Sequence, residues 1–155
     1  MKARLDHAAA APAIFKAMVG LESALGASGL EHSLRELVKT RASQINGCAF
    51  CLEMHTREAV AAGEDPVRLN VLPGWRESPL FSTRERAALE WTEHLTEVAS
   101  RGAPDEVFAR VRAEFDDADL AALTYLIGTI NVWNRMSVGF AVPHMLPARA
   151  AGAAA

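Results

Sequence analysis

Residues 36–55 read ELVKTRASQINGCAFCLEMH, and this stretch organises the whole chain. Its first half carries apolar residues at helical spacing, and the Asn-Gly pair at 46–47 is a typical helix stop. Cys48 and Cys51, the two cysteines of the protein, follow directly, and His55 comes four residues later. The pattern predicts two helices joined by a tight turn, with the cysteine pair at the start of the second helix.

The rest of the chain also has helical periodicity and lacks a convincing strand. Apolar residues recurring every three or four positions predict helices over about 8–27, 33–46, 48–62, 82–98, 104–115 and 118–140, with a loop and a short helical turn in 64–79. The last of these is apolar nearly all round, which predicts burial against several helices or at a subunit interface.

Helix starts are marked by short polar patterns. Ser33 with Glu36 and Ser82 with Glu85 both fit a capping box. Asp116 or Asp117 is expected to cap the last helix. The chain is therefore predicted to be all-α, a single compact domain of about six to seven helices over residues 1–155, with a disordered Ala/Gly-rich tail beyond Pro143.

Composition limits the function classes. The chain has 155 residues, of which 50% are hydrophobic and 23% charged, and its formal net charge is −3. The absence of a dense basic block argues against nucleic acid as a partner, and no charge-free apolar run reaches membrane-spanning length. Asp6, His7 and Lys16 interrupt what would be a signal peptide, so we expect a cytoplasmic protein. Two cysteines in that compartment favour catalysis or metal binding over a structural disulfide.

The cysteine patch offers redox chemistry. On one helix, Cys48, Cys51 and His55 fall close to a single stripe. The helix N-terminus, a nearby imidazole and a second thiol each lower the pKa of a cysteine thiol towards neutrality. A thiolate attacks a peroxide to give a sulfenic acid, the partner thiol condenses with it to a disulfide, and an external dithiol regenerates the pair. Position alone favours Cys48 as the more ionised sulfur.

Glu36 lies one predicted helix earlier. Its carboxylate reaches the cysteine patch only if the two helices pair antiparallel across the Asn-Gly turn. It would then hold the imidazole of His55 in place and stabilise its protonated form. The competing interpretation is that Glu36 serves only the capping box with Ser33.

Other interpretations of these residues stay open. The cysteines can be two small buried residues without reactivity, or Cys48, Cys51, His55 and Glu36 can be four zinc ligands. Three aromatic residues are expected to pack in the core or an interface rather than to line a pocket: Trp91, Tyr125 and Trp133.

Arg135 is expected to pair with the carboxylate of Glu36 or Glu93. Four histidines are expected to lie outside any functional cluster: His7, His32, His94 and His144.

The segment from Arg35 to His55 resembles the core of the AhpD-like alkylhydroperoxidase family, within the carboxymuconolactone decarboxylase superfamily. The shared pattern is a Glu twelve residues before the first Cys, a Cys-x-x-Cys pair and a His four residues after the second Cys. Further resemblance at 91–93 and 130–135 extends it over about 15–145. It implies an all-helical fold, a homo-oligomer (trimer or hexamer) and thiol-dependent reduction of hydroperoxides without a cofactor or a metal.

By the same resemblance, Cys51 is the sulfur that attacks the peroxide and Cys48 is its disulfide partner, while His55 and Glu36 form a proton relay. A dithiol compound or redox protein is the implied reductant. The best-known AhpD proteins carry a second His just before the second Cys, where this chain has Phe50. That departure bears on the reductant and on peroxidase efficiency.

Two alternative functions accompany this one. The first is lactone decarboxylation, the activity that names the superfamily, although such members generally lack the paired cysteines. The second is a non-enzymatic oligomeric redox sensor that uses the disulfide as a switch.

Overall fold

The computed structural model describes residues 2–144, and within that range the chain is entirely helical, with no strand. The helices are α1 (His7–Ala10), α2 (Pro12–Gly26), α3 (His32–Asn46), α4 (Ala49–Ala61), α5 (Pro66–Val71), the 3-10 turn η1 (Leu72–Gly74), α6 (Thr83–Thr96), α7 (Val98–Arg101), α8 (Asp105–Glu114) and α9 (Asp117–Gly139). The all-α prediction is confirmed. The helices outnumber the six to seven expected because α1, α5 and α7 are short pieces. The predicted tail falls, from residue 145 on, outside the described residues.

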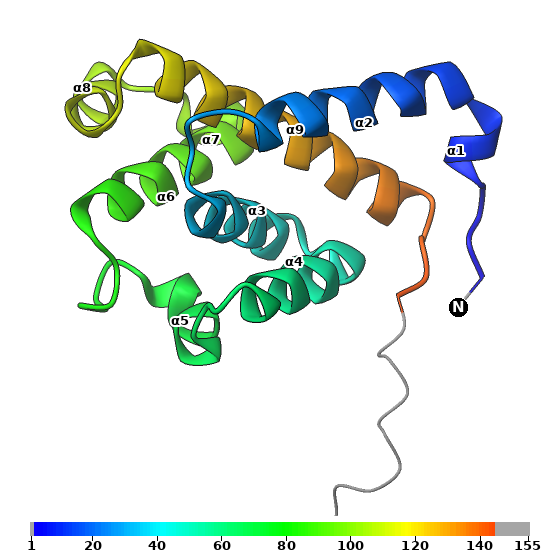
Figure 1. The fold of residues 1–155 in the computed structure, drawn as a ribbon, viewed down its shortest axis with the longest axis horizontal. Helices are drawn as coiled ribbons and strands as arrows, with labels where there is room; N and C mark the ends of the chain where they lie inside the picture. Colours follow the sequence, from blue (N-terminus) through cyan, green and yellow to red (C-terminus); the bar gives the residue numbers. More distant parts are fainter. Residues whose placement is uncertain (1, 145–155) are drawn as a thin grey trace, which may run out of the picture.

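Helix α3 is the centre of the fold (Figure 1). It packs against α4, α6 and α9, and α2 lies along α9. Leu37, Val38 and Ala42 of α3 have no exposed surface. Because α3 is enclosed by three helices, the core fixes where it ends and where the turn into α4 begins.

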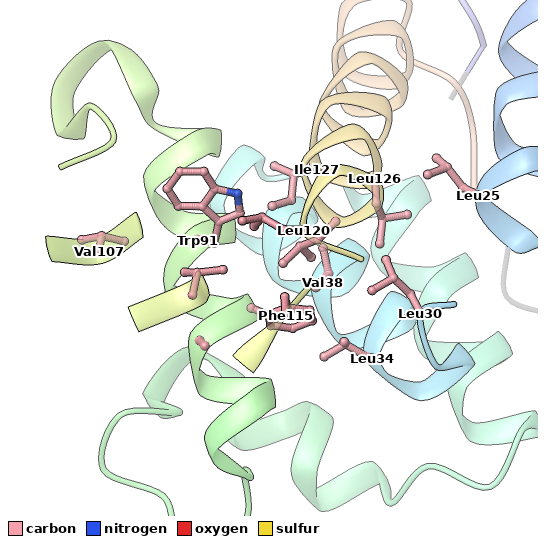
Figure 2. Packing of buried hydrophobic residues seen from close by; sticks show 14 residues of the cluster. Leu25, Leu30, Leu34, Val38, Trp91, Val107, Phe115, Leu120, Leu126 and Ile127 are labelled. Carbon is pink, nitrogen blue, oxygen red and sulfur yellow. The ribbon is translucent and has the colours of Figure 1, made fainter. Parts of the chain in front are cut away.

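Two apolar clusters hold these helices together. The larger one joins α3, α6, α8 and α9 around Trp91, Phe115 and Leu123, and Figure 2 shows its side chains interdigitating. The smaller one packs Leu37 of α3 against η1 and the loop before α6 through Leu72 and neighbouring residues. Burial of apolar surface at about 25 cal/mol per Å² makes these clusters the main source of stability.

The long helix α9 is buried along only one side. Leu123, Leu126 and Ile130 are enclosed, whereas Tyr125 and Val132 on the other side are 66% and 41% exposed. Burial against several helices is therefore observed for one face. Packing of Tyr125 in a subunit interface stays a prediction.

The two predicted capping boxes differ in outcome. Ser82 and Glu85 form the reciprocal box at the start of α6, as expected. At α3 the prediction is wrong, since the N-cap is Glu31, without a side-chain cap bond, and Ser33 lies inside the helix. The carboxylate of Glu36 is used elsewhere, as described below. Asp116 caps α9 by accepting from the Asp119 amide, which confirms that expectation.

The predicted helix over 8–27 is divided. Pro12 stands at the first position of α2, and Ala11 before it has non-helical φ and ψ of −137° and 62°. A proline favours an extended residue before it, which ends α1 after one turn. The break lets the N-terminal segment fold back towards the end of α9, where the Arg4 amide donates to the Phe140 carbonyl at 2.8 Å. Over the described residues, no helix is long and apolar enough to cross a membrane.

Candidate active site

The turn between α3 and α4 carries the cysteine pair. Gly47 ends α3 with a φ of 64°, in the left-handed region that glycine adopts without steric cost. Cys48 is the N-cap of α4, and its Sγ accepts from the Cys51 amide at 3.3 Å. The two cysteines form a disulfide, with 5.4 Å between their Cα atoms, and each is 1% exposed.

Glu36 and His55 meet across the two helices. Helices α3 and α4 pack together after the Gly47 turn, and His55 Nδ1 lies 2.9 Å from Glu36 Oε2. Both residues are 4% exposed. The structure therefore joins Glu36 to His55 and Cys48 to Cys51, and Cys51 and His55 line the same cavity. Their catalytic roles stay predictions.

The surroundings keep Glu36 ionised. Burial acts to raise the pKa of its carboxyl group, but the hydrogen bond and charge of His55, with smaller contributions from Lys39 and His32, outweigh burial and lower that pKa overall. An ionised Glu36 accepts a hydrogen bond from the N–H of His55 Nδ1, which fixes the imidazole tautomer and orientation. It also leaves Nε2 as the nitrogen available for proton exchange.

A second layer of charges backs this pair. Lys39 Nζ lies 3.0 Å from Glu22 Oε2 and 3.8 Å from Glu36 Oε1. Trp133 Nε1 donates to Glu22 Oε1 at 3.0 Å. The sequence prediction missed Glu22 and Lys39, because they meet only through the packing of α2 and α3 against α9. The one local signal was Glu22, a charged residue among the apolar residues Met18, Val19 and Leu25.

A cavity of about 520 Å³ opens beside the disulfide. Its wall includes Cys51, His55 and Phe50 from α4, but Cys48 is not among the lining residues. The wall also includes Trp133, for which packing was the favoured prediction and whose ring meets Phe15 edge-on with the centroids 5.7 Å apart.

His7 also lines the cavity, so the prediction that it lies outside any functional cluster is wrong. Its ring stacks on Phe140 at 5.9 Å between centroids. The fold-back at Pro12 brings it there, and the local sequence carries no sign of that contact. The N-terminal segment and the end of α9 thus close one side of the cavity.

Glu58 completes a possible ligand set. Glu36, His55 and Glu58 offer donor atoms that all lie within 4.8 Å of one another. This set differs from the zinc site considered from the sequence, because Cys48 and Cys51 are bonded to each other in this structure. Zinc on the cysteines requires their reduction, since thiolates are the ligands.

Asparagine side chains fix the turn to α9. Asn46 Nδ2 donates to Asn131 Oδ1 at 3.0 Å and to Asn134 Oδ1 at 2.9 Å. Asn134 Nδ2 donates to Ser43 Oγ at 3.0 Å, and Asn134 is 1% exposed. These bonds join the last turn of α3 to the middle of α9, so the position of the cysteine pair depends on a helix far away in the sequence.

Arg135 bonds to Asn131 and not to Glu36 or Glu93, so the prediction of a carboxylate partner is wrong. Its guanidinium donates to the carbonyl and side-chain oxygens of Asn131. Glu93, one of the two candidates, instead accepts from Arg41, Arg76 and Trp75, among others. Burial acts to raise the pKa of Glu93, but these donors lower it overall.

Fold and site together define an all-helical protein with a vicinal cysteine pair next to a buried Glu–His pair. The model of the carboxymuconolactone decarboxylase family matches residues 12–94, which span α2 to the greater part of α6. The chain belongs to this family.

Similar proteins agree with this assignment. The uncharacterized protein YdfG of Bacillus subtilis is 41% identical over 138 residues, covering 89% of this chain and 94% of YdfG. The crystal structure of a protein from Agrobacterium tumefaciens has 44% sequence identity to this chain and a TM-score of 0.90, and the match covers 94% of this chain and all of the other. The function of that protein is unknown, and its suggested designation is antioxidant defence protein AhpD. An alkylhydroperoxidase AhpD core structure from Ralstonia eutropha shares the fold, with a TM-score of 0.77 and 21% sequence identity. The match covers 88% of this chain and 73% of the Ralstonia eutropha chain. The resemblance to AhpD-like proteins is confirmed.

Proposed function

We propose that this protein is a thiol-dependent peroxidase that reduces hydroperoxides through Cys48 and Cys51. The observation that carries the proposal is the arrangement at the cavity, where Cys51 and His55 line the wall while Cys48 lies behind as a disulfide partner. A hydroperoxide in the cavity meets Cys51 first. This supports Cys51 as the attacking sulfur over Cys48, which helix position alone favours.

The reaction has three balanced steps. The Cys51 thiolate attacks the terminal peroxide oxygen, the O–O bond breaks, and the alkoxide takes a proton to leave as an alcohol, so that Cys51 becomes a sulfenic acid. The Cys48 thiol then attacks that sulfur, forms the disulfide and releases water. An external dithiol finally reduces the disulfide and is itself oxidised to a disulfide.

His55 and Glu36 serve the proton transfers in this scheme. His55 accepts the proton of the Cys51 thiol and returns it to the alkoxide. Glu36, held at 2.9 Å from Nδ1, stabilises the imidazolium that exists between the two transfers. Glu36 acts through His55 and is a positioning residue.

The reductant and the assembly belong to the same proposal. A dithiol compound or redox protein regenerates the pair, and a trimer or hexamer of the chain in the cytoplasm is the working form. Phe50, which stands where the best-known AhpD proteins have a His, lines the cavity and makes its wall more apolar. We therefore expect a reductant that differs from theirs.

The test begins with the reduced protein and one equivalent of cumene hydroperoxide. Both thiols of each chain should be lost while one equivalent of alcohol forms. Excess dithiothreitol should restore both thiols. The Cys48→Ser variant should consume peroxide once and stop. The Cys51→Ser variant should retain its thiol. If neither wild-type thiol reacts and zinc copurifies stoichiometrically, the site is a metal centre instead.

The alternatives make different predictions. A decarboxylase would release carbon dioxide from a lactone acid in the Cys48→Ser variant as well as in the wild type. A redox sensor would oxidise once but show no turnover with any dithiol. The location of Cys51 on an open cavity supports turnover over sensing alone.

A further inference from the structure

The cavity beside Cys51 has an apolar wall. Its larger apolar side chains come from α2, α4, α9 and the segment after α9: Phe15, Val19, Phe50, Met54, Trp133 and Val142. A volume of about 520 Å³ falls in the range of small-molecule sites. The wall thus fits the body of a ring-sized or branched apolar molecule whose reactive end faces Cys51.

The charges on the same wall are unbalanced. Lys39 is the one Lys or Arg among the described lining residues, and it is already engaged by Glu22 at 3.0 Å and by Glu36 at 3.8 Å. Glu58 lies on the wall with 48% of its side chain exposed, and its Oε2 is 3.8 Å from His55 Nδ1. Glu22 and Glu36, the latter just behind the wall, therefore both engage Lys39, and Glu58 adds a further negative charge to the wall.

His7, His55 and, in the reduced protein, Cys51 are the other titratable groups on the wall. With both imidazoles neutral, the local balance of Glu22, Glu36 and Glu58 against Lys39 is negative by two charges. Protonation of His55 alone leaves it negative. Because Glu22 and Glu36 already engage the ammonium group of Lys39, it is not available to bind a substrate carboxylate. Glu58 would repel such a carboxylate.

We propose that this cavity selects neutral apolar hydroperoxides and discriminates against hydroperoxides that carry a carboxylate, with Glu58 as a specificity-determining residue. The proposal rests on the proposed peroxidase function and names its substrate class. The cavity should favour uncharged aryl and alkyl hydroperoxides over the hydroperoxides of free fatty acids and other organic acids.

The experiment compares three matched substrates on the reduced full-length protein. They are cumene hydroperoxide, its para-carboxylate derivative, and the methyl ester of that derivative, which keeps the added size without the charge. We expect kcat/KM for the carboxylate to be about tenfold below that for the ester, because the negative charge of Glu58 repels the carboxylate. Raising the ionic strength should shrink this ratio.

Glu58→Gln should reduce the ester-to-carboxylate ratio to about threefold or less, because one repelling charge is gone. The matched control is Glu53→Gln, since Glu53 lies on the same helix, pairs with Arg57 at 2.9 Å and is outside the cavity wall. It should leave the ratio unchanged. Equal kcat/KM for ester and carboxylate in the wild type would overturn the proposal, and so would a ratio that Glu58→Gln does not change.

A binding measurement keeps this inference separate from the peroxidase proposal. The three corresponding alcohols, titrated against tryptophan fluorescence, report charge selectivity without any turnover. If no hydroperoxide is consumed but the ester alcohol binds about tenfold more tightly than the carboxylate alcohol, the peroxidase function fails and the charge selectivity stands. If the carboxylate alcohol binds as tightly as the ester, the charge selectivity fails whatever the activity.

Discussion

Replacement of Glu36 by Gln tests how the buried pair works. Gln has the same shape and can still hydrogen-bond to His55 Nδ1, so the variant removes a charge and little else. A hydrogen bond to a charged group contributes about 1.5–3 kcal/mol and a neutral one about 1 kcal/mol. The imidazolium of His55 should therefore lose about 1–2 kcal/mol of stabilisation.

That loss converts into a rate. An increase of about 1–2 kcal/mol in the barrier slows the attack of Cys51 on peroxide by roughly 5- to 30-fold at neutral pH. Because the imidazolium becomes less favourable, the Cys51 thiol is harder to ionise, and the rate should rise at higher pH in the variant than in the wild type. Stopped-flow consumption of cumene hydroperoxide across a pH series measures both effects.

A double-mutant cycle tests whether Glu36 affects the rate through His55. Glu36 acts through His55, so Glu36→Gln should have little further effect in a His55→Ala background. Glu53→Gln, which removes a carboxylate of α4 that does not line the cavity, is the charge-matched control. An unchanged rate and pH profile in Glu36→Gln, or an equally large loss without His55, would refute the positioning role.

Further predictions concern stability and are measured by chemical denaturation and thermal melts. Glu93→Gln removes the buried partner of several arginines and should destabilise the fold by about 3 kcal/mol. Because the folded-state pKa of Glu93 is lowered, the stability it contributes is present above its ordinary value of 4.5 and should be lost as pH falls through the folded pKa. Gly47→Ala, at a φ of 64°, should cost about 1–2 kcal/mol, whereas Gly20→Ala inside α2 should gain about 0.5–1 kcal/mol. Ser82→Ala should cost about 1 kcal/mol and Ser33→Ala almost nothing, since only Ser82 caps a helix; equal effects would contradict the cap assignment.

Local spacing predicted the part of the site that lies on one helix. Cys48, Cys51 and His55 are close because of helical periodicity alone, and Gly47 marks the turn before them. Glu36 required the pairing of two helices, which the family resemblance implied.

The rest of the site depends on packing between distant segments. Glu22, Lys39 and Trp133 meet because α2 and α3 both pack against α9, and His7 reaches the cavity because Pro12 turns the chain back. No local pattern encodes these contacts. A hydrophobic period states which face is buried but not which helix covers it.

The failed capping box at Ser33 shows the same limit. Ser33–Glu36 and Ser82–Glu85 have the same spacing, yet Glu85 returns to its own helix start and Glu36 bonds to His55 nineteen residues later. The outcome depends on the partner that the fold supplies.

The most direct test of the central claim is to locate the oxygen after a single oxidation. The reduced Cys48→Ser variant is treated with one equivalent of cumene hydroperoxide in the presence of dimedone, and its peptides are analysed by mass spectrometry. We expect a dimedone adduct on Cys51 of the variant, and no adduct in the wild type, where Cys48 closes the disulfide first. An unlabelled Cys51 in the variant, with the peroxide left intact, would contradict it.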